Sequence, residues 1–343
     1  MNNDILIQSV LIGYSIICIK PLVSSLNIKN RFVVYGSSFA FFWGSIALIS
    51  IISIMVEIYL SINIYNPLII FLIIFISCLI FNNFSENKYN LASRDFFVFI
   101  IASALTYLSS YFYIPRIRGG DGFWLTQTAF SLANNNLNIG GFAGGGHRAP
   151  LWILLESYSL MASNYLLFNF QILSAFFALM ILISTLLSKL TSKNEKIVLT
   201  LLVLTLITSP AYVALSIYFE IHPFASLLII LLWYFLDAKK YTKNSYFLNS
   251  ILLIIFCSTL SLARFEGFLL AVPFLYKFFQ IEKKLINLNI YLVLFTVNSL
   301  WYFNLINMGI VHKSSSEYIF LIISLIPHVS LLSFYIFEKF LSF

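Results

Sequence analysis

Residues 116 to 150, RIRGGDGFWLTQTAFSLANNNLNIGGFAGGGHRAP, form the longest polar stretch in a chain that is otherwise almost continuously apolar. The stretch contains an isolated acid, three arginines and one histidine. Apolar runs of membrane-spanning length, about 20 residues, lie on both sides of it. We therefore expect a long loop outside the membrane, and we expect the chemistry of the protein to lie there.

The composition indicates a membrane protein. The chain of 343 residues is 60% hydrophobic and 10% charged, and its mean hydropathy is +0.94, well outside the range of soluble globular domains. We expect a single all-α polytopic domain over residues 1–343. The candidate spans, about eleven in number, are 5–26, 32–56, 66–82, 96–115, 165–189, 197–218, 224–237, 246–263, 266–280, 288–308 and 318–337. Cys18, Cys78 and Cys257 each lie inside an apolar run without paired or metal-type spacing, which predicts small core residues.

The shorter apolar piece 149–163 decides the topology. Suppose that this piece enters the membrane and returns to the side from which it came. In that case all 20 basic residues lie on one face of the membrane, except Arg116, Arg118, Arg148, Arg264 and Lys313. The positive-inside rule then makes that face cytoplasmic. We expect a re-entrant or interfacial segment here, an external N-terminus and a cytoplasmic C-terminus. The net charge of +7 follows from this topology and gives no indication of nucleic-acid binding.

Arginines are concentrated on the predicted outer face, whereas nearly all lysines are inside. The planar guanidinium suits phosphate and carboxylate oxygens, so external arginines indicate an anionic ligand; contact with lipid headgroups is the alternative. Within the loop, Asp121 lies between glycines, and a carboxylate beside a bilayer is a candidate base. After it, Leu125, Ala129, Leu132 and Ala133 share one helical face, which predicts an amphipathic helix over 123–136 lying flat on the membrane. Trp124 would anchor this helix or stack on a sugar ring.

The end of the loop and two short external turns supply the other candidates. His147 and Arg148 precede the re-entrant segment and can meet a substrate headgroup, with interfacial anchoring as the alternative. Glu220 and His222 could serve a divalent metal or a proton relay, although two residues do not make a metal site. Arg264 and Glu266 either pair with each other or contact substrate. Weaker candidates are Glu156, His312, Lys313 and Glu317. The inner connections are short and lysine-rich and lack a nucleotide-binding glycine pattern.

Four of these elements resemble the type C glycosyltransferase superfold, in which lipid-linked sugar donors are used on the external face. Asp121 begins an amphipathic helix, and His147-Arg148-Ala149-Pro150-Leu151 is similar to the family's His-Pro-Pro-Leu. Glu220-Ile221-His222-Pro223 lies in the second external loop, and Leu262-Ala263-Arg264-Phe265-Glu266-Gly267 is similar to the family's Thr-Arg-Pro-Glu-Gly turn. The resemblance covers about residues 96 to 280, so three helices before residue 96 and two helices in 281–343 are additional to this core.

The resemblance implies transfer of a sugar from a polyprenyl-phosphate or polyprenyl-diphosphate donor to a hydroxyl of an envelope glycan or glycolipid, such as a lipopolysaccharide. Asp121 would be the general base, and Arg148 and Arg264, with Arg118, would neutralise the leaving phosphate. The enzyme would lie in a bacterial inner membrane with its site facing the periplasm. Gly122 stands where the family often has a second acid, so the resemblance gives no firm prediction of a divalent metal cofactor.

Two other functions fit the same pattern. An O-antigen polymerase joins whole lipid-linked repeat units on the same face and also needs arginines and a base. A flippase or other transporter of lipid-linked oligosaccharides should instead carry charged residues near the middle of the bilayer. The charges of this chain lie mainly at the ends of its predicted spans, which favours an enzyme.

Overall fold

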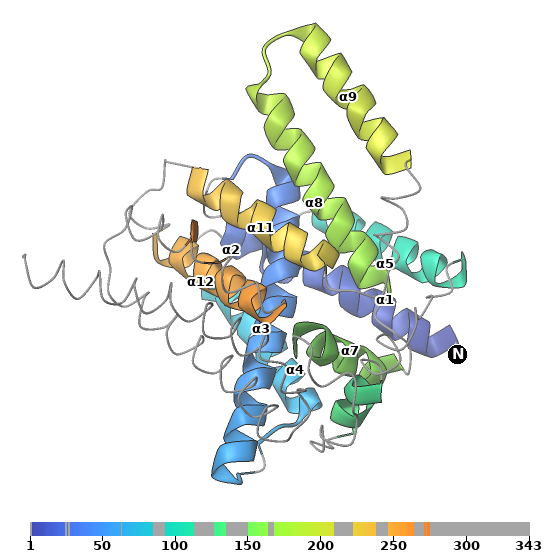
Figure 1. The fold of residues 1–343 in the computed structure, drawn as a ribbon. Helices are drawn as coiled ribbons and strands as arrows, with labels where there is room; N and C mark the ends of the chain where they lie inside the picture. Colours follow the sequence, from blue (N-terminus) through green and yellow to red (C-terminus); the bar gives the residue numbers. More distant parts are fainter. Residues whose placement is uncertain are drawn as a thin grey trace, which may run out of the picture.

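The computed structural model describes residues 2–24, 26, 28–62, 64–84, 93–112, 127–134, 150–163, 168–208, 222–237, 246–263, 271 and 273–274, and most of these residues lie in helices. No strand occurs in these ranges. Figure 1 shows the helices α1 (Asn2–Ile17), α2 (Lys20–Ser24), α3 (Arg31–Leu60), α4 (Pro67–Phe84), α5 (Ser93–Phe112), α7 (Pro150–Ser163), α8 (Phe168–Lys189), α9 (Lys193–Thr208), α11 (His222–Asp237) and α12 (Tyr246–Ala263). The all-α prediction is therefore confirmed for this part of the chain.

Most apolar runs of the sequence coincide with one helix each, but the run 5–26 does not. It is divided into α1, which ends at Ile17, and the short α2, which begins at Lys20. Pro21 explains the break, because a proline ring inside a continuous helix would collide with the carbonyl of the residue four positions earlier, here Ile17. The run expected to form one membrane span is therefore divided between two helices. The runs 288–308 and 318–337, and most of 266–280, lie outside the described residues.

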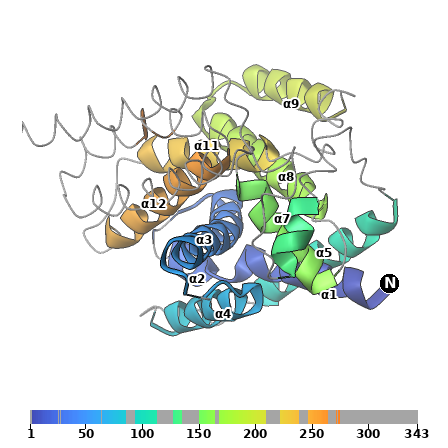
Figure 2. The same cartoon turned by 60° about the horizontal axis from the view of Figure 1, so that its bottom comes forward.

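Helix α3 is the centre of the packed structure. It packs against α1, α2, α4, α7, α8, α11 and α12, and Figure 2 shows it surrounded by these helices. Phe39, Phe42 and Trp43 on α3 are completely buried, and close van der Waals packing of such side chains holds helices together. The N-terminal helices, to which sequence reasoning assigned no role, therefore belong to the same hydrophobic core as α7, α8, α11 and α12.

The start of α3 is fixed by a side-chain cap. Asn30 has extended backbone angles, and its Oδ1 accepts a hydrogen bond from the backbone N–H of Phe32 at 3.1 Å, as expected of an N-cap residue. Its Nδ2 donates to Ser184 Oγ of α8 at 2.7 Å. A single residue therefore starts α3 and holds it against the C-terminal half of α8.

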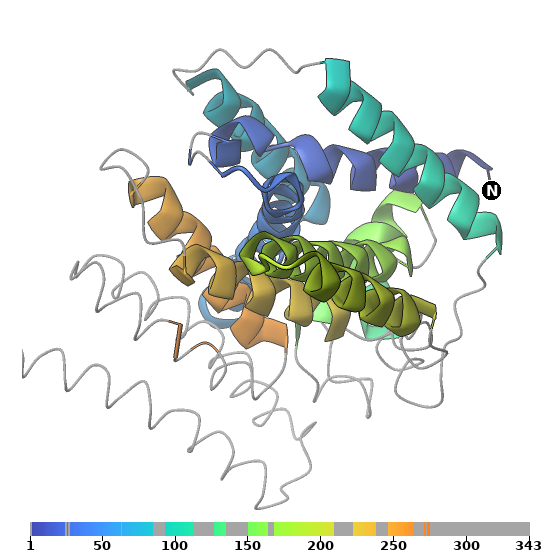
Figure 3. The same cartoon turned by 90° about the horizontal axis from the view of Figure 1, so that it is seen from above.

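Helices α1 and α5 lie side by side, and α1 packs against α3, which is seen end-on in Figure 3. Their close approach depends on Gly13, where an added Cβ would come within 3.1 Å of the backbone oxygen of Phe99 and would overlap Ser103 Oγ. A second close crossing occurs at Gly44 of α3, whose added Cβ would lie 2.6 Å from Thr259 Oγ1 of α12. Small residues at helix crossings are typical of membrane proteins.

Two described helices are long and apolar enough to cross a membrane, namely α3 over Arg31–Leu60 and α8 over Phe170–Lys189. Shorter apolar helical segments lie at Ile5–Ile17, Ile69–Cys78, Pro223–Leu236 and Ser250–Ala263. Helix α7 is mostly buried in the protein interior. Its 14 residues extend about 21 Å at 1.5 Å per residue, which is shorter than a hydrocarbon core of about 30 Å.

The amphipathic segment expected over 123–136 is helical where it is described, at residues 127–133. Ala129 and Leu132, two residues of the predicted apolar face, are fully buried and belong to the protein core, whereas Phe130 is exposed. The predicted face is therefore confirmed at these two positions. These two residues are buried in the protein core, and the predicted position of the helix flat on the membrane stays a prediction.

Candidate functional site

The residues selected from the sequence fall largely outside the described part of the chain. His222 is the first residue of α11, and Glu156 is a fully buried residue of α7. The others lie outside the described residues: Arg118, Asp121, Trp124, His147, Arg148, Glu220, Arg264 and Glu266, and the weaker candidates His312, Lys313 and Glu317. The site is therefore described through the helix ends that adjoin these positions in the sequence.

The starts of three helices, two of which adjoin candidate positions, are joined by aromatic contacts. Trp152, in the first turn of α7, has its ring centroid 6.3 Å from that of Phe170, in the first turn of α8. The Phe170 ring lies 4.7 Å from Phe224, in the first turn of α11. All three rings are buried. In the sequence, His147 and Arg148 come just before α7, and Glu220 comes just before α11, so the starts of two helices that follow predicted site segments meet at Phe170.

The centre of α3 closes this aromatic group. Phe39 lies 5.1 Å from Phe170 and 6.2 Å from Phe224 between ring centroids, and Trp43 lies 5.5 Å from Phe170. We call the residues Phe39, Trp43, Trp152, Phe170 and Phe224 the aromatic junction. Edge-on and tilted ring pairs of this kind contribute about 0.5–1.5 kcal/mol each beyond the burial of their surface. The junction therefore holds the starts of α7, α8 and α11 in fixed positions on α3.

The end of α12 belongs to the same region of the core. Leu262 and Ala263, its last residues, are buried members of the hydrophobic core, and α12 packs against both α3 and α7. The crossing at Gly44 places Thr259 of α12 directly against α3, one residue along α3 from Trp43. Arg264 follows α12 immediately in the sequence. The helix ends that adjoin Arg148, Glu220 and Arg264 are thus packed on neighbouring parts of α3.

Buried polar groups lie around this region. Gln171, next to Phe170 in the sequence, is only 2% exposed, and neither its Oε1 nor its Nε2 has a hydrogen-bond partner within the described part of the chain. Ser50 of α3 and Tyr158 of α7 form a buried hydroxyl pair at 2.6 Å. Because Ser50 Oγ already donates to the Ile46 carbonyl oxygen at 2.7 Å, the Tyr158 hydroxyl is the donor to Ser50.

The connection from α3 to α4 is ordered by Glu57. Its Oε2 accepts hydrogen bonds from the backbone N–H groups of Ile64, at 3.2 Å, and Tyr65, at 3.0 Å. Ser61 ends α3 in the left-handed conformation, with φ 54° and ψ 30°. Burial raises the pKa of the Tyr65 hydroxyl to about 12, and the nearby Glu57 carboxylate adds to this increase. Tyr65 therefore stays neutral at physiological pH and is unsuited to act as a base.

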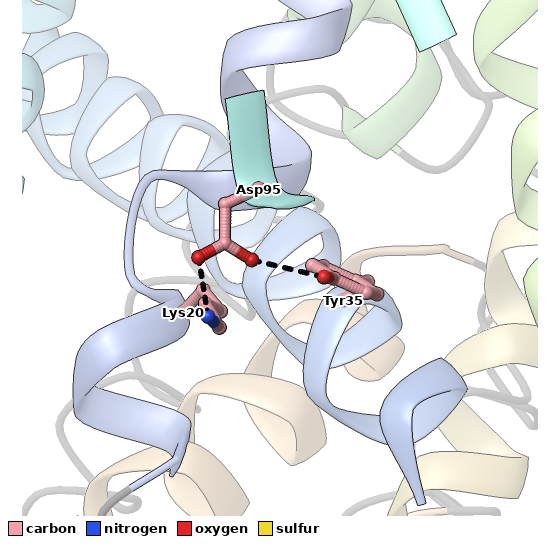
Figure 4. Close-up of polar contacts among 3 residues, drawn as sticks. All are labelled: Lys20, Tyr35 and Asp95. Carbon is pink, nitrogen blue, oxygen red and sulfur yellow. Dashed lines mark hydrogen bonds and ion pairs between the residues drawn. The ribbon is translucent and has the colours of Figure 1, made fainter. Parts of the chain in front are cut away.

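A charged cluster that sequence reasoning missed lies near the start of α3. Figure 4 shows Lys20 of α2, Tyr35 of α3 and Asp95 of α5 pointing toward one another. Lys20 Nζ lies 2.5 Å from Asp95 Oδ2, and the Tyr35 hydroxyl donates to Asp95 Oδ1 at 3.0 Å. The Asp95 carboxylate is 98% buried, since its side chain is 2% exposed. The charged pair joins α2 to α5, Tyr35 adds α3 to the cluster, and the geometry is that of a structural ion pair.

The sequence contained one signal for this cluster. Asp95 is an acid in the first turn of α5, where it interacts favourably with the helix dipole, and it directly precedes a strongly apolar run. Sequence reasoning assigned Lys20 to the basic residues of the cytoplasmic face. In the structure, the Lys20 side chain is 18% exposed and paired. Because residues 20 and 95 are far apart in the chain, only the packing of α2 against α3 and of α1 against α5 reveals their contact.

The described residues contain no group of three or more histidine, cysteine, aspartate or glutamate side chains that could hold a metal ion. Cys18, Cys78 and Cys257 are free and buried, which confirms them as core residues. No protein-family model, curated protein or solved structure matches this chain.

Proposed function

We propose that this chain is a membrane glycosyltransferase that moves a sugar or oligosaccharide from a polyprenyl-phosphate or polyprenyl-diphosphate donor to a hydroxyl of an envelope glycan or glycolipid. The single observation that carries the proposal is the packing of the helix ends beside Arg148, Glu220 and Arg264 around α3. These positions lie far apart in the sequence. A shared active site requires their helices to meet, and the aromatic junction supports this requirement for α7 and α11.

Exposed apolar stripes support placement in a membrane. On α5, Phe97, Ile101, Leu105 and Leu108 are each at least 40% exposed and recur every three or four residues. On α4, exposed isoleucines and leucine follow the same spacing, at Ile69, Leu72, Ile73, Ile76 and Ile80. Water-soluble monomers rarely expose contiguous apolar surfaces of this extent. A lipid bilayer is the environment in which such helix faces are stable.

The positions of basic residues support the proposed orientation. Lys20, Arg31 and Arg94 lie at the starts of α2, α3 and α5, which meet around Tyr35 and Asp95. At the C-terminal end of α8, Lys189 lies over the Trp233 ring of α11, 5.0 Å from its centroid. Under the positive-inside rule these helix ends face the cytoplasm. The starts of α7, α8 and α11 would then face the periplasm of a bacterial inner membrane.

The orientation can be tested by labelling single cysteines. In a background without the three native cysteines, Asn134→Cys and Lys193→Cys place thiols at exposed positions that the proposal assigns to opposite faces. A membrane-impermeant maleimide should label Asn134→Cys in intact spheroplasts and Lys193→Cys only after permeabilisation. Labelling of Lys193→Cys in intact spheroplasts would contradict the orientation.

In the proposed mechanism, Asp121 removes the proton from the acceptor hydroxyl as that oxygen attacks the anomeric carbon of the donor. The bond between this carbon and the phosphate oxygen breaks at the same time, and the polyprenyl phosphate or diphosphate leaves. Arg148 and Arg264, with Arg118, neutralise the negative charge that develops on the leaving group. A positioned base contributes about 10²–10⁴-fold to such a reaction.

The test combines a gene deletion with matched variants. We expect the deletion strain to make surface polysaccharide chains of normal length that lack one sugar, and the wild-type gene to restore that sugar. Asp121→Asn should fail to restore it, because the amide cannot accept the proton. Glu195→Gln, which neutralises an exposed acid of α9, should restore it fully. Full restoration by well-expressed Asp121→Asn would refute the assignment of Asp121 as the base.

The same experiment separates the transferase from a polymerase, because chains reduced to a single repeat unit would indicate an O-antigen polymerase. A transporter is the second candidate function, and one observation favours it: Glu156 is a fully buried carboxyl group within α7, and buried ionisable residues in membrane helices mark transport pathways. Reconstituted vesicles distinguish the two. Movement of a labelled polyprenyl-diphosphate sugar across the bilayer without formation of a glycosidic bond would indicate transport.

A further inference from the structure

A group of exposed basic side chains lies at the corner where α3 and α5 begin. Arg31 is the first residue of α3 and Arg94 is the second of α5, and both are exposed, as is Lys29 in the connection before α3. The two arginines are far apart in the sequence, yet both lie close enough to Tyr35 to act electrostatically on its hydroxyl group. The fold therefore brings them to one corner of the protein, beside the cluster shown in Figure 4.

The positive charge of this corner is not neutralised within the described part of the chain. Asp95, whose carboxylate accepts the Tyr35 hydrogen bond, is already paired with Lys20. Neither Arg31 nor Arg94 forms an ion pair with a described residue. The helix dipoles add to the positive charge, because the N-terminal ends of α3 and α5 both lie here. Since like charges held close together repel one another, a bound anion would be stabilised at this corner.

The surface beside the arginines is apolar. Phe96 and Phe97, which follow Arg94 directly, are each 61% exposed, and Ile100 and Ile101 continue the exposed surface along α5 at 45% and 40%. A soluble phosphate compound would leave this surface uncovered. A phospholipid covers it, because the acyl chains lie along the apolar helix while the headgroup meets the basic side chains.

The charges of the corner also select the type of headgroup. A zwitterionic headgroup carries a cationic amine beside its phosphate, and the basic side chains would repel that amine. The headgroup of phosphatidylglycerol carries a phosphate and neutral hydroxyl groups, so its net charge is negative. The planar donor fork of arginine binds phosphate oxygens through two hydrogen bonds. An anionic phospholipid therefore fits this corner better than a zwitterionic one.

We propose that the corner formed by Lys29, Arg31 and Arg94 binds an anionic phospholipid of the phosphatidylglycerol class. The phosphate lies between the starts of α3 and α5, and the acyl chains lie along the exposed face of α5. The Lys20–Asp95 pair holds α2 against α5 and so fixes the corner. This inference goes beyond the proposed transferase activity and depends only on placement of the chain in a membrane.

The test measures lipid binding by purified protein in detergent, with native mass spectrometry as the readout. The probes are dioleoylphosphatidylglycerol, dioleoylphosphatidylcholine with the same acyl chains, and glycerol phosphate without acyl chains. The wild-type protein should bind phosphatidylglycerol most tightly. Each basic side chain near an anionic lipid surface contributes about fivefold to affinity, so Arg31→Gln/Arg94→Gln should weaken phosphatidylglycerol binding by roughly 25-fold. Binding of phosphatidylcholine should change little.

The matched control is Lys193→Gln/Lys196→Gln. It removes two exposed positive charges from the start of α9, a helix end that the proposed orientation also assigns to the cytoplasmic face. There Glu195 lies between the two lysines in the sequence, and the affinity for phosphatidylglycerol should equal that of the wild type. Because all four side chains are exposed, both double variants should keep the wild-type unfolding temperature in detergent without added lipid.

Each contrary result has a distinct meaning. Equal losses of affinity in the two double variants would overturn the inference, because general attraction to a positive face would then explain the binding. Equal binding of the two lipids by the wild-type protein would also overturn it, and this result does not depend on the folding of any variant. Glycerol phosphate binding as tightly as phosphatidylglycerol would show a site for a soluble phosphate compound instead. None of these results measures sugar transfer, so the proposed function is tested separately.

Discussion

Replacing Lys20 with methionine should destabilise the protein more than replacing Asp95 with asparagine. In Lys20→Met the ammonium group is absent. The Asp95 carboxylate, whose side chain is 2% exposed, still accepts a hydrogen bond from the Tyr35 hydroxyl but loses its counter-charge. Breaking a buried ion pair in this way costs about 3–5 kcal/mol, and we expect the lower end because the Tyr35 bond remains. In Asp95→Asn the cost is nearer 1–2 kcal/mol, because the 18% exposed lysine can extend its charge toward solvent.

The double variant Lys20→Met/Asp95→Asn provides the decisive comparison. It removes both charges, so neither is left buried without its partner, and its loss of stability should be smaller than the sum of the two single losses by at least about 1 kcal/mol. An additive result would show that the two side chains do not interact in the folded protein.

The assay uses the buried cysteines of the chain. Cys18, Cys78 and Cys257 are all buried, so a thiol-reactive fluorophore labels them only as the protein unfolds during heating in detergent. Lys29→Met is the control, because Lys29 is an exposed lysine at the same end of α3 and its replacement should leave the unfolding temperature unchanged. If Lys20→Met and Lys29→Met unfold at the same temperature, the ion pair contributes nothing to stability and the reasoning is refuted.

Two further predictions concern helix packing. Gly13→Ala should lower stability by about 1–3 kcal/mol, as overpacking does, because the new methyl group would be pressed against Ser103 and the Phe99 carbonyl. Adding Ser103→Ala should recover part of the lost stability in the same unfolding assay. No recovery would show that Ser103 is not the obstacle. For the buried hydroxyl pair, Ser50→Ala should cost more than Tyr158→Phe, since it leaves the donor of Tyr158 without an acceptor. Equal losses would contradict the assigned direction of that hydrogen bond.

The positions of the helices were largely predictable from the sequence, because the length of an apolar run determines how much chain a helix can bury. The run 32–56 lies within α3, and 224–237 lies within α11. Pro21 also encodes the division of the run 5–26 locally. A mean hydropathy is taken over many residues, so it does not show the effect of one proline. The geometry of proline predicts a break in the helix near Lys20.

Packing partners could not be predicted in the same way. The spacing of Ala129 and Leu132 correctly indicated an apolar helix face, yet a periodic pattern specifies only that a face is buried. It does not distinguish a bilayer from a neighbouring helix, and here the protein core covers these residues. The contact between Lys20 and Asp95 is a similar case, since it joins helices that are distant in the sequence and leaves no periodic signal. Most of the candidate site lies outside the described residues, so its prediction stays open.

Mutation of the Lys20–Asp95 pair should change stability and leave substrate binding unchanged. The Lys20–Asp95 pair is satisfied within the folded chain, so its loss reduces the amount of folded protein. The KM of the molecules that remain folded should stay constant. If Lys20→Met instead increased KM in fully folded protein, the ion pair would be coupled to the substrate through α3. The idea that one end of this helix is structural and another region serves binding would then be wrong.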